Sequence, residues 1–401
     1  MEKTRIHKLT TIAQSEMRAI NRSAVLEYLR LAKKASRTEL SVQLRISKPT
    51  AMRIIDELVA DGWVVDLDQK EKGSRRSREM LALNTHNNLV IGVDLGGSHI
   101  SGVIADIGGE IIHQIHVNQK WQSPTENYAI LVEFIQALEV EAHKNGARTL
   151  GIAIGVPGIV DSKSGLVRIA PSLNWRDFPL LEKLRQEFSL PVIIENDVNL
   201  AALGENWFGA GVGVANMVMI SIGTGIGSGI ILDGKLHRGF RESSGEIGYL
   251  LPGIQYLDNQ YPGFGALESL ASCKGIAEKA CRELEKIDPK LDPSTIDAAM
   301  VFESARAGKP WAVRIVAETV DLLSLAILTV SVSFDPELII IGGGIVGSLD
   351  LLIEPIQKRL NQVIPFVPRI EGSALKGNAP LLGCVVRVFQ KSVDYTVAQV
   401  V

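Results

Sequence analysis

The apolar positions at the start of the chain recur at the spacing of helices that are buried on one side. Within residues 23–32 the apolar side of a predicted first helix consists of Val25, Leu26, Leu29 and Ala32. Ser36, with Glu39 three residues later, forms a capping-box pattern. This pattern predicts a short second helix that continues through Leu40 to Leu44.

A third helix is predicted from an N-cap at Ser47 to about Ala60, with Pro49 in its first turn, where proline is tolerated. Its apolar side consists of Ala51, Ile54, Ile55 and Leu58. Its outer side near the N-terminus carries Lys48, Thr50 and Arg53. Side chains of this kind on a recognition helix reach base edges in the major groove of DNA.

Two short strands are predicted after this helix, at 63–65 and 80–83, around a basic loop over 70–78. The tip of the loop carries Arg75, Arg76 and Arg78. Arginines in such a wing suit contacts with DNA phosphates or with the minor groove. Residues 1–86 are therefore predicted to form a winged helix-turn-helix DNA-binding domain, and docking onto a partner protein is the alternative use of such a domain.

The rest of the chain contains one pattern twice: an apolar strand, a glycine turn and a second strand. The strands are predicted at 88–93 and 99–104 in the first copy, and at 217–222 and 228–232 in the second. The turns contain Asp94, Gly96 and Gly97 in the first copy and Gly223, Thr224 and Gly225 in the second. Such turns let backbone amides approach an anion closely, so the pair predicts a cleft for a nucleoside triphosphate, whereas either turn alone could serve hairpin geometry.

Other nucleotide-binding patterns give weaker signals. The P-loop pattern GxxxxGK[ST] does not occur in the sequence. Gly342, Gly344 and Gly347 satisfy G-x-G-x-x-G, but the chain ends too soon after them to complete a dinucleotide-binding domain. We interpret the turn of Gly342, Gly343 and Gly344 as a surface beneath an adenosine.

Charge is distributed unevenly along the chain. The formal net charge is -3, yet residues 1–89 contain 17 Lys and Arg against 11 Asp and Glu. A basic head on an acidic body favours a polyanionic partner for the head alone.

Composition indicates soluble folded domains. The 401 residues are 46% hydrophobic and 22% charged, and no window reaches the roughly 18 uninterrupted apolar residues of a membrane span. The charged start does not resemble a signal peptide, so we expect a cytoplasmic location and no membrane partner. The three cysteines, Cys273, Cys281 and Cys384, are expected to be buried small apolar residues rather than a disulfide framework.

Several motifs occur together and in one order over nearly the whole length of the chain. They lie at 17–22, 73–84, 94–97, 155–161, 195–199, 223–229, 245–248, 267–268 and 342–344. On these motifs the sequence resembles the ROK family of bacterial repressors, open reading frames and sugar kinases. Its N-terminal domain resembles the repressor branch of that family, which includes xylose and N-acetylglucosamine repressors.

The resemblance implies an α/β fold in which the winged helix-turn-helix domain is followed, over 87–401, by a two-lobed actin-like or hexokinase-like ATPase fold. One lobe is expected over 87–205 together with the C-terminal end of the chain, and the other over 206–384.

The resemblance also implies roles for individual polar residues. Asp197 would be the general base toward a sugar hydroxyl in a kinase, and Asn196 would hold a neighbouring hydroxyl. Glu246 and Glu268 match family carboxylates that accept hydrogens from sugar hydroxyls. Such roles agree with the chemistry, because phosphoryl transfer requires mainly proton removal, positioning and charge neutralisation.

The sequence departs from the family pattern around Tyr249. This residue stands where family members carry a zinc-binding histidine, and residues 252–266 contain none of the family's cysteine ligands, with Ala266 at the last ligand position. The structural zinc is therefore expected to be absent. Tyr249 also replaces a usual sugar contact, and both stacking on a sugar and core packing remain open for its ring.

The glycine turns, in contrast, keep the family's nucleotide motifs, so ATP and Mg²⁺ binding stay open although neither is required for a sensor. We predict a sugar-responsive repressor that binds a pseudo-palindromic operator as a homodimer or higher homo-oligomer. An ATP-dependent hexose or N-acetylhexosamine kinase with a DNA-binding head is the alternative. A scaffold that binds a phosphocarrier protein is the third hypothesis.

Overall fold

The computed structural model describes residues 14–67, 80–261, 265–286 and 292–395, and the chain divides into two compact units. The smaller unit contains residues 1–88 and 389–401, and the larger unit contains residues 89–388. The sequence had assigned the whole C-terminal end to the larger domain. Residues 389–395 instead pack with the N-terminal residues, because Phe389 and Tyr395 contact side chains there.

Among its described residues, the smaller unit contains three complete helices and a three-stranded sheet of strand order β1-β3-β2. Its elements are α1 (Gln14–Ala32), β1 (Ala35–Ser36), α2 (Arg37–Gln43), α3 (Lys48–Ala60), β2 (Val64–Leu67) and β3 (Met80–Leu83). The predicted capping box is confirmed, since Glu39 N donates to Ser36 Oγ and Ser36 N donates to Glu39 Oε2. The two-residue strand β1 was not predicted.

Helix α1 begins at Gln14, earlier than residue 23 as predicted from the apolar pattern. Its extra turns carry few apolar residues and form ion pairs with α3 and its C-cap. Arg18 contacts Glu57 at 2.7 Å, and Arg22 contacts both Glu57 and Asp61. Hydrophobic periodicity does not detect a helix segment of this kind.

The larger unit contains two five-stranded sheets with similar connections. The first has the strand order β11-β7-β4-β5-β6 and the second β14-β13-β12-β15-β16. The first sheet and its helices consist of β4 (Asn88–Leu95), β5 (His99–Asp106), β6 (Ile111–Asn118), α4 (Pro124–Lys144), β7 (Arg148–Val156), α5 (Leu180–Glu187), β11 (Val192–Asn196) and α6 (Asp197–Phe208). A small sheet of β8 (Ile159–Asp161), β9 (Leu166–Ala170) and β10 (Trp175–Phe178) lies between β7 and α5 along the chain.

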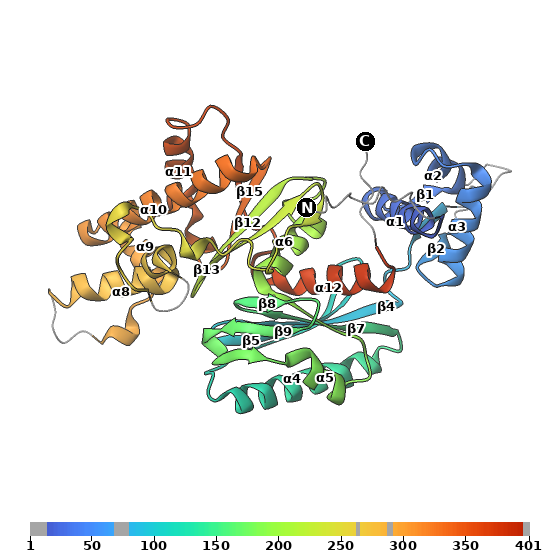
Figure 1. Cartoon of the computed structure of the whole chain (residues 1–401), viewed down its shortest axis with the longest axis horizontal. Coiled ribbons are helices and arrows are strands. Elements are labelled where there is room, and N and C mark those ends of the chain that lie inside the picture. Colours follow the sequence, from blue (N-terminus) through green and yellow to red (C-terminus); the bar gives the residue numbers. More distant parts are fainter. Residues whose placement is uncertain (1–13, 68–79, 262–264, 287–291, 396–401) are drawn as a thin grey trace, which may run out of the picture. The chain divides into compact units, whose positions relative to one another are not determined.

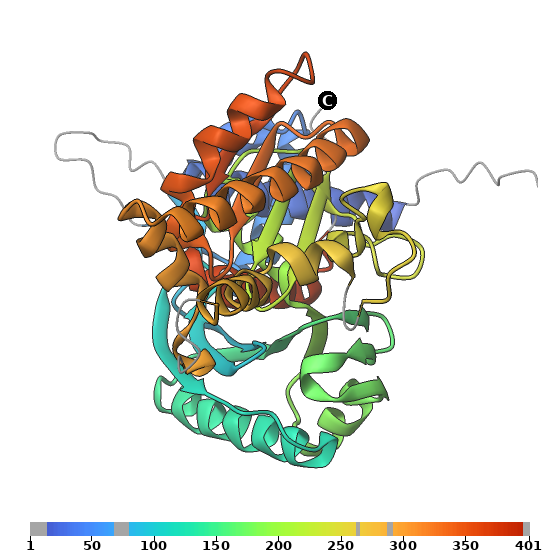
Figure 2. The same ribbon diagram turned by 90° about the vertical axis from the view of Figure 1, so that its left-hand side faces the viewer.

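The second sheet is covered by a set of helices (Figures 1 and 2). Its strands are β12 (Met217–Ile222), β13 (Ile226–Leu232), β14 (Lys235–Leu236), β15 (Leu338–Gly342) and β16 (Arg369–Gly372). Its helices are α7 (Ala266–Ala271), α8 (Cys273–Leu284), α9 (Ala298–Arg306), α10 (Pro310–Phe334) and α11 (Ile353–Leu360). In each sheet an antiparallel hairpin, β4–β5 or β12–β13, carries one of the predicted glycine turns.

Helix α12 (Ala379–Ser392) lies on the face of the first sheet opposite α4 (Figure 1). A Cβ placed on Gly92 of β4 would lie 2.9 Å from Cβ of Cys384 in this helix. Helix α12 thus already contacts the first sheet at Leu381, three residues before the predicted boundary of the second lobe at 384.

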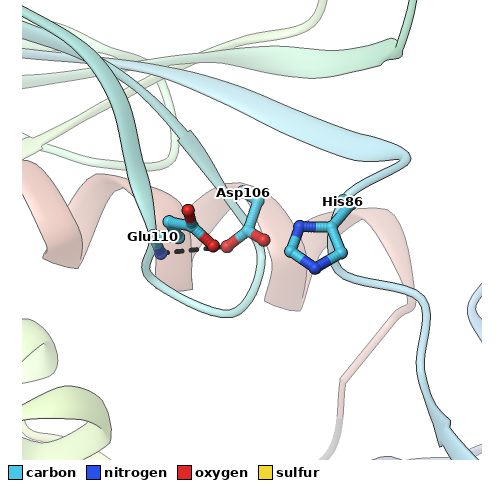
Figure 3. A group of neighbouring side chains, drawn as sticks. All are labelled: His86, Asp106 and Glu110. Atoms are coloured by element: carbon cyan, nitrogen blue, oxygen red, sulfur yellow. Dashed lines mark hydrogen bonds between the residues drawn. The ribbon is translucent and has the colours of Figure 1, made fainter.

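The turn between β5 and β6 is fixed by the buried Asp106. Its Oδ1 accepts hydrogen bonds from Gly108 N and from Glu110 N, both at 2.9 Å. Figure 3 shows the bond from Glu110 N. Gly109 has φ +90°, and a Cβ there would lie 2.9 Å from the ring of Phe208. Glycine is required here both for the backbone conformation and for the approach of α6 to the sheet.

Helix α10 is long and apolar enough to cross a membrane by length and composition, and 61% of its apolar window is buried inside the protein. The sequence prediction, which searched for 18 or more apolar residues, did not single out this helix. Its buried side chains form part of the core beneath the second sheet. The three cysteines are only partly as predicted, since Cys384 is buried whereas Cys273 and Cys281 are half-buried.

Candidate functional site

The N-terminus of α6 positions the two central residues of the candidate sugar site. Asn196 caps the helix, since its Oδ1 accepts from Asn199 N at 2.8 Å, while its Nδ2 donates to Gly158 O at 2.9 Å. Asp197 is the first helical residue, and its Oδ1 accepts from Val198 N at 2.9 Å. The capping pattern explains why an Asn-Asp pair fits this place. One hydrogen of the Asn196 amide and one carboxylate oxygen of Asp197 remain for a ligand.

Four carboxylates gather around this helix start: Asp94, Asp197, Glu246 and Glu268. Burial raises the pKa of Asp197 well above its ordinary value, and the charges of Asp94 and Glu246 raise it further. Burial, and then the charge of Glu268, raises the pKa of Glu246 to about 7. Carboxyl groups held in this way favour hydrogen-bonded neutral partners such as hydroxyl groups, which relieve the burial of their oxygens.

Glu268 and Glu246 are each fixed by a glycine. The Oε2 atom of Glu268, on α7, accepts from Ile226 N at 3.0 Å, and a Cβ on Gly225 would lie 2.6 Å from that oxygen. Gly245, directly before Glu246, has φ +93°, and a Cβ there would overlap the carbonyl oxygen of Ser228. The second glycine hairpin therefore helps to position both carboxylates of the candidate site, a role that the sequence did not predict for it.

Tyr249 lies on the short helical turn Ile247–Tyr249, directly after Glu246. Its side chain is exposed, with 47% of its surface accessible, so core packing is excluded for the ring. Burial of part of the phenol, together with the charges of Glu246 and Glu268, raises its pKa. Tyr249 thus lies near the carboxylate group with its ring accessible, which suits a contact with a ligand.

The two predicted glycine turns face each other. A Cβ on Gly97 would lie 2.6 Å from Oγ1 of Thr224, which brings the β4–β5 turn to the β12–β13 turn. Gly344, after β15, adjoins Gly223, and a Cβ on Gly223 would meet only the backbone of Gly344, at 3.9 Å. Gly342 ends β15 and Gly343 adopts φ +84°. Gly223 therefore presents backbone that no side chain covers, which fits a nucleotide held by glycine amides, whereas Met219 fills the space beside Gly342.

The first glycine turn fits a nucleotide less well because of His99. The His99 ring occupies the space that a side chain on Gly96 would fill, and its Nε2 lies 3.6 Å from Oδ2 of Asp94. The ring also packs on His116, with 5.0 Å between centroids, and His116 Nδ1 is hydrogen-bonded to Ser101 Oγ. A phosphate or Mg²⁺ ion at Asp94 would require this imidazole to move.

The segment in which the family carries zinc ligands includes, among its described residues, the short 3-10 helix Ile254–Tyr256. Cys273 begins α8, where its Sγ donates to Ile222 O and burial raises its thiol pKa to about 11. Residues 262–264 lie outside the described part of the chain. The absence of zinc therefore remains a prediction.

The candidate DNA-contacting residues of the smaller unit lie on α3. Its buried side consists of Ala51, Ile54, Ile55 and Leu58, as predicted. Ser47 caps the helix through Thr50 N, and Ser47 Oγ also contacts Thr50 Oγ1 at 2.8 Å. Lys48 and Arg53 are exposed and form no ion pair with other described residues. The predicted wing arginines Arg75, Arg76 and Arg78 lie outside the described residues.

Comparison with known proteins identifies the larger unit. A family model described as the ROK family matches residues 90–388. The chain belongs to the ROK family. It is 31% identical to a xylose repressor of Caldicellulosiruptor bescii over 94% of this chain and 98% of that protein. It is also 34% identical to a glucokinase of Halalkalibacterium halodurans, over 71% of this chain and 88% of that protein.

Solved structures show the same division between regulators and kinases. A ROK family transcriptional regulator, described as a homologue of the E. coli MLC protein, is 25% identical and covers 94% of this chain and 96% of its own, with a TM-score of 0.81. A ROK glucokinase of Streptomyces griseus, solved with glucose and AMPPNP, is 30% identical and covers 75% of this chain and 99% of its own, with a TM-score of 0.65. The two five-stranded sheets are thus the actin-like halves of the α/β ROK fold.

Proposed function

We propose that this protein is a sugar-responsive, DNA-binding transcriptional repressor. The main support is that the xylose repressor and the regulator structure match along nearly the whole chain, whereas the glucokinases match only about the larger unit. A kinase has no need of the smaller unit. The proposed partners are operator DNA and a small sugar, and the proposed location is the cytoplasm.

In this proposal the smaller unit is a winged helix-turn-helix domain over residues 1–86, completed by the C-terminal residues. Helix α3 would enter the major groove with Lys48, Thr50 and Arg53, and the wing arginines Arg75, Arg76 and Arg78 would contact phosphates or the minor groove. The exposure of Lys48 and Arg53 and the tight packing of the opposite side of α3 support this assignment.

The proposed sugar site consists of Asn196, Asp197, Glu246, Tyr249 and Glu268. Its carboxyl groups would accept hydrogens from sugar hydroxyls, the Asn196 amide would donate to a hydroxyl oxygen, and the exposed ring of Tyr249 would stack on the sugar face. Several buried polar groups of this kind give selectivity, because an analogue that lacks one hydroxyl leaves its partner unpaired. The names of the relatives suggest D-xylose and D-glucose as first ligands.

We propose that the protein acts as a homodimer or higher homo-oligomer. Two α3 helices would then contact two half-sites of a pseudo-palindromic operator, and a ligand would change operator affinity by altering their spacing.

The alternative function, an ATP-dependent sugar kinase, is favoured by one observation: the open glycine surface at Gly223 and Gly344, next to the facing turns of Gly97 and Thr224. In that case Asp94 and the glycine turns would hold ATP together with Mg²⁺. ATP would supply the phosphoryl group, and Mg²⁺ would neutralise its charge. Asp197 would remove the proton from the attacking hydroxyl. The raised pKa of Asp197 suits this role, although His99 beside Asp94 does not suit a bound metal.

The variant Asp197→Asn distinguishes the two functions. Asparagine still forms hydrogen bonds with a hydroxyl but cannot accept its proton. We expect the parent protein to bind a duplex selected from random DNA, to change its affinity with D-xylose or D-glucose, and to consume little ATP. The variant should keep most of that response. Sugar-dependent ATP consumption by the parent that disappears in the variant would instead establish the kinase.

A further inference from the structure

Glu195, directly before the sugar-site residues, is a buried carboxylate shared by two arginines from distant segments. Its Oε2 accepts from Arg238 Nε at 3.1 Å and from Arg238 Nη2 at 2.6 Å. Arg387, on α12, places its Nε 3.4 Å from the same oxygen. This Nε has no hydrogen-bond partner among the described residues. Oε2 of Glu195 therefore lies within ion-pair distance of two guanidinium groups, but among the described residues it accepts hydrogen bonds only from Arg238.

The other oxygen of Glu195 is directed to the sugar site. Oε1 accepts from Asn199 Nδ2 at 3.4 Å and from Asn196 N at 3.3 Å, so the carboxylate is tied to the first turn of α6. Arg238 begins the loop that ends at Gly245 and Glu246. Within that loop Ser244 N donates to Arg238 O at 3.1 Å. A ligand that moves Glu246 or the start of α6 would thus alter the position of Arg238 relative to Glu195.

Helices α6 and α12 are also in direct backbone contact. A Cβ on Gly383 would overlap the carbonyl oxygen of Leu200, and a Cβ on Gly204 would overlap the carbonyl oxygen of Ala379. Contact this close leaves no room for one helix to slide independently of the other, because close-packed interfaces change between discrete arrangements rather than deform smoothly. The α6–α12 pair therefore moves as one body.

The far end of α12 belongs to the smaller unit. Phe389 packs edge-on against the buried Trp63, with 5.7 Å between ring centroids. Tyr395 donates a hydrogen bond to Glu27 Oε2 at 2.8 Å, and Glu27 is also paired with Arg30. Helix α12 thus begins on the first sheet and α6, carries Arg387 at Glu195, and ends in contacts with the core and first helix of the smaller unit.

We propose that Glu195 is the junction that couples the sugar site to the smaller unit, with Arg387 as the positioning residue. In this mechanism ligand binding changes the sharing of Glu195 between Arg238 and Arg387, and α12 carries that change to Phe389 and Tyr395. The inference rests on the proposed function and adds its transmission route. A buried carboxylate with two competing cations is suited to two alternative pairings, since each pairing is strong only when its geometry is good.

The experiment compares the full-length parent with Arg387→Met, which keeps an unbranched apolar side chain but removes the guanidinium group and its charge. The readouts are the dissociation constants for D-xylose and D-glucose by calorimetry, and for a duplex that the parent itself selects from random DNA. Their coupling is the ratio of DNA affinities with and without the sugar. Arg387→Lys tests rescue by charge, and Lys391→Met, an exposed residue one turn further along α12, is the matched control.

We expect the parent and Lys391→Met to show a coupling ratio of about 5-fold or more, within the usual range of allosteric effects. In Arg387→Met the ratio should fall to within about 2-fold of unity, while sugar affinity and sugar-free DNA affinity change by less than about 3-fold. Arg387→Lys should keep part of the ratio. Amide hydrogen exchange at 389–395 should respond to sugar in the parent but not in Arg387→Met.

The outcomes separate the failure of this inference from failure of the proposed function. A parent that responds to sugar while Arg387→Met keeps the same ratio would overturn the coupling role of Arg387. Sugar binding without any change in exchange at 389–395 would overturn the route through α12. If neither sugar alters DNA binding by the parent, the proposed function fails and the inference fails with it. If Arg387→Met does not fold, Arg387→Lys and Tyr395→Phe supply the same comparison, and both should weaken the ratio.

Discussion

At the scale of single residues, the raised pKa of Glu246 makes the stability of the protein depend on pH. In the folded protein the neutral form of this carboxyl group is favoured, because burial and the charge of Glu268 oppose its ionisation. Its pKa rises from 4.5 to about 7 on folding. The folded state therefore binds a proton more tightly than the unfolded state, and stability is lost as the pH rises from about 4.5 to about 7.

Glu246→Gln should remove this dependence. In the absence of sugar we expect the variant to match the parent near pH 4.5 and to exceed its free energy of unfolding above pH 7 by up to ~3 kcal/mol. Urea denaturation at a series of pH values measures the difference. Glu133→Gln, which changes an exposed carboxylate on α4, should show no such trend. If Glu246→Gln exceeds the parent in free energy of unfolding by the same amount at every pH, the pKa of Glu246 is not raised by folding.

The residue scale also shows what the sequence could predict. The capping roles of Ser36 and Ser47 were predictable because each side chain bonds to a backbone amide three residues away. The pairing of Glu195 with Arg238 spans 43 positions, and that of Tyr395 with Glu27 spans 368. No local pattern signals such contacts. The motif over 195–199 identified the neighbourhood, but only the fold brings Arg387 to it.

At the scale of elements, α3 combines a packed side with exposed cations, which is the arrangement of a helix that binds in a groove. Its boundaries and buried face could be predicted from periodicity and capping signals. The first turns of α1 could not, because they contact α3 through ion pairs rather than apolar side chains. The two glycine hairpins were predicted to bind the phosphates of a nucleoside triphosphate. Their further role, in placing Glu268 and Glu246, depends on packing between elements that are distant in the sequence.

Arg53→Ala tests α3 as the recognition helix. An exposed arginine that contacts a base edge contributes ~1–3 kcal/mol to operator binding, and its loss should also relax the base preference at one position. Arg75→Ala in the predicted wing should instead weaken binding to all DNA sequences and reduce the salt dependence. Fluorescence anisotropy with specific and random duplexes measures both effects, with Arg369→Ala in the larger unit as the control. Unchanged affinity in both variants would refute the DNA-binding assignment.

Gly383→Ala tests the contact between α6 and α12. The added methyl group would overlap the carbonyl oxygen of Leu200, so the helices must separate. We expect a loss of ~1–3 kcal/mol in the free energy of unfolding, as for other overpacked interiors. Gly347→Ala is the matched control, because a Cβ there meets nothing within 4 Å. Equal stability of the two variants would show that the contact is looser than described.

The loop region around Tyr249 carries a prediction about metal content. With tyrosine in place of the family's histidine and no cysteine over 252–266, the ligands that bind structural zinc most tightly are missing. Elemental analysis of the purified protein should find far less than one zinc per chain, and a chelator should not lower its melting temperature. A stoichiometric zinc content would refute the prediction.

At the scale of the whole molecule, the chain passes between the two units twice, once after residue 88 and once within α12. The sequence placed the first passage close to its observed position, because the apolar strand β4 begins there. It missed the second, since the apolar pattern of α12 continues without a break from one unit to the other. The smaller unit therefore includes residues 389–395, and we expect its stability to depend on them.

A chain that ends at Val388 tests this dependence. Truncation removes Phe389 from Trp63 and Tyr395 from Glu27, which exposes an aromatic surface of the smaller unit to water. Loss of a buried aromatic side chain costs ~3–5 kcal/mol, enough to unfold a small unit that is marginally stable. Calorimetry should show a lower melting temperature for the smaller unit, or no unfolding transition for it. Operator binding should be lost.

The larger unit keeps its sheets and carboxylates and should still bind sugar. Operator binding at parental affinity by the truncated chain would contradict the assignment of residues 389–395 to the DNA-binding unit.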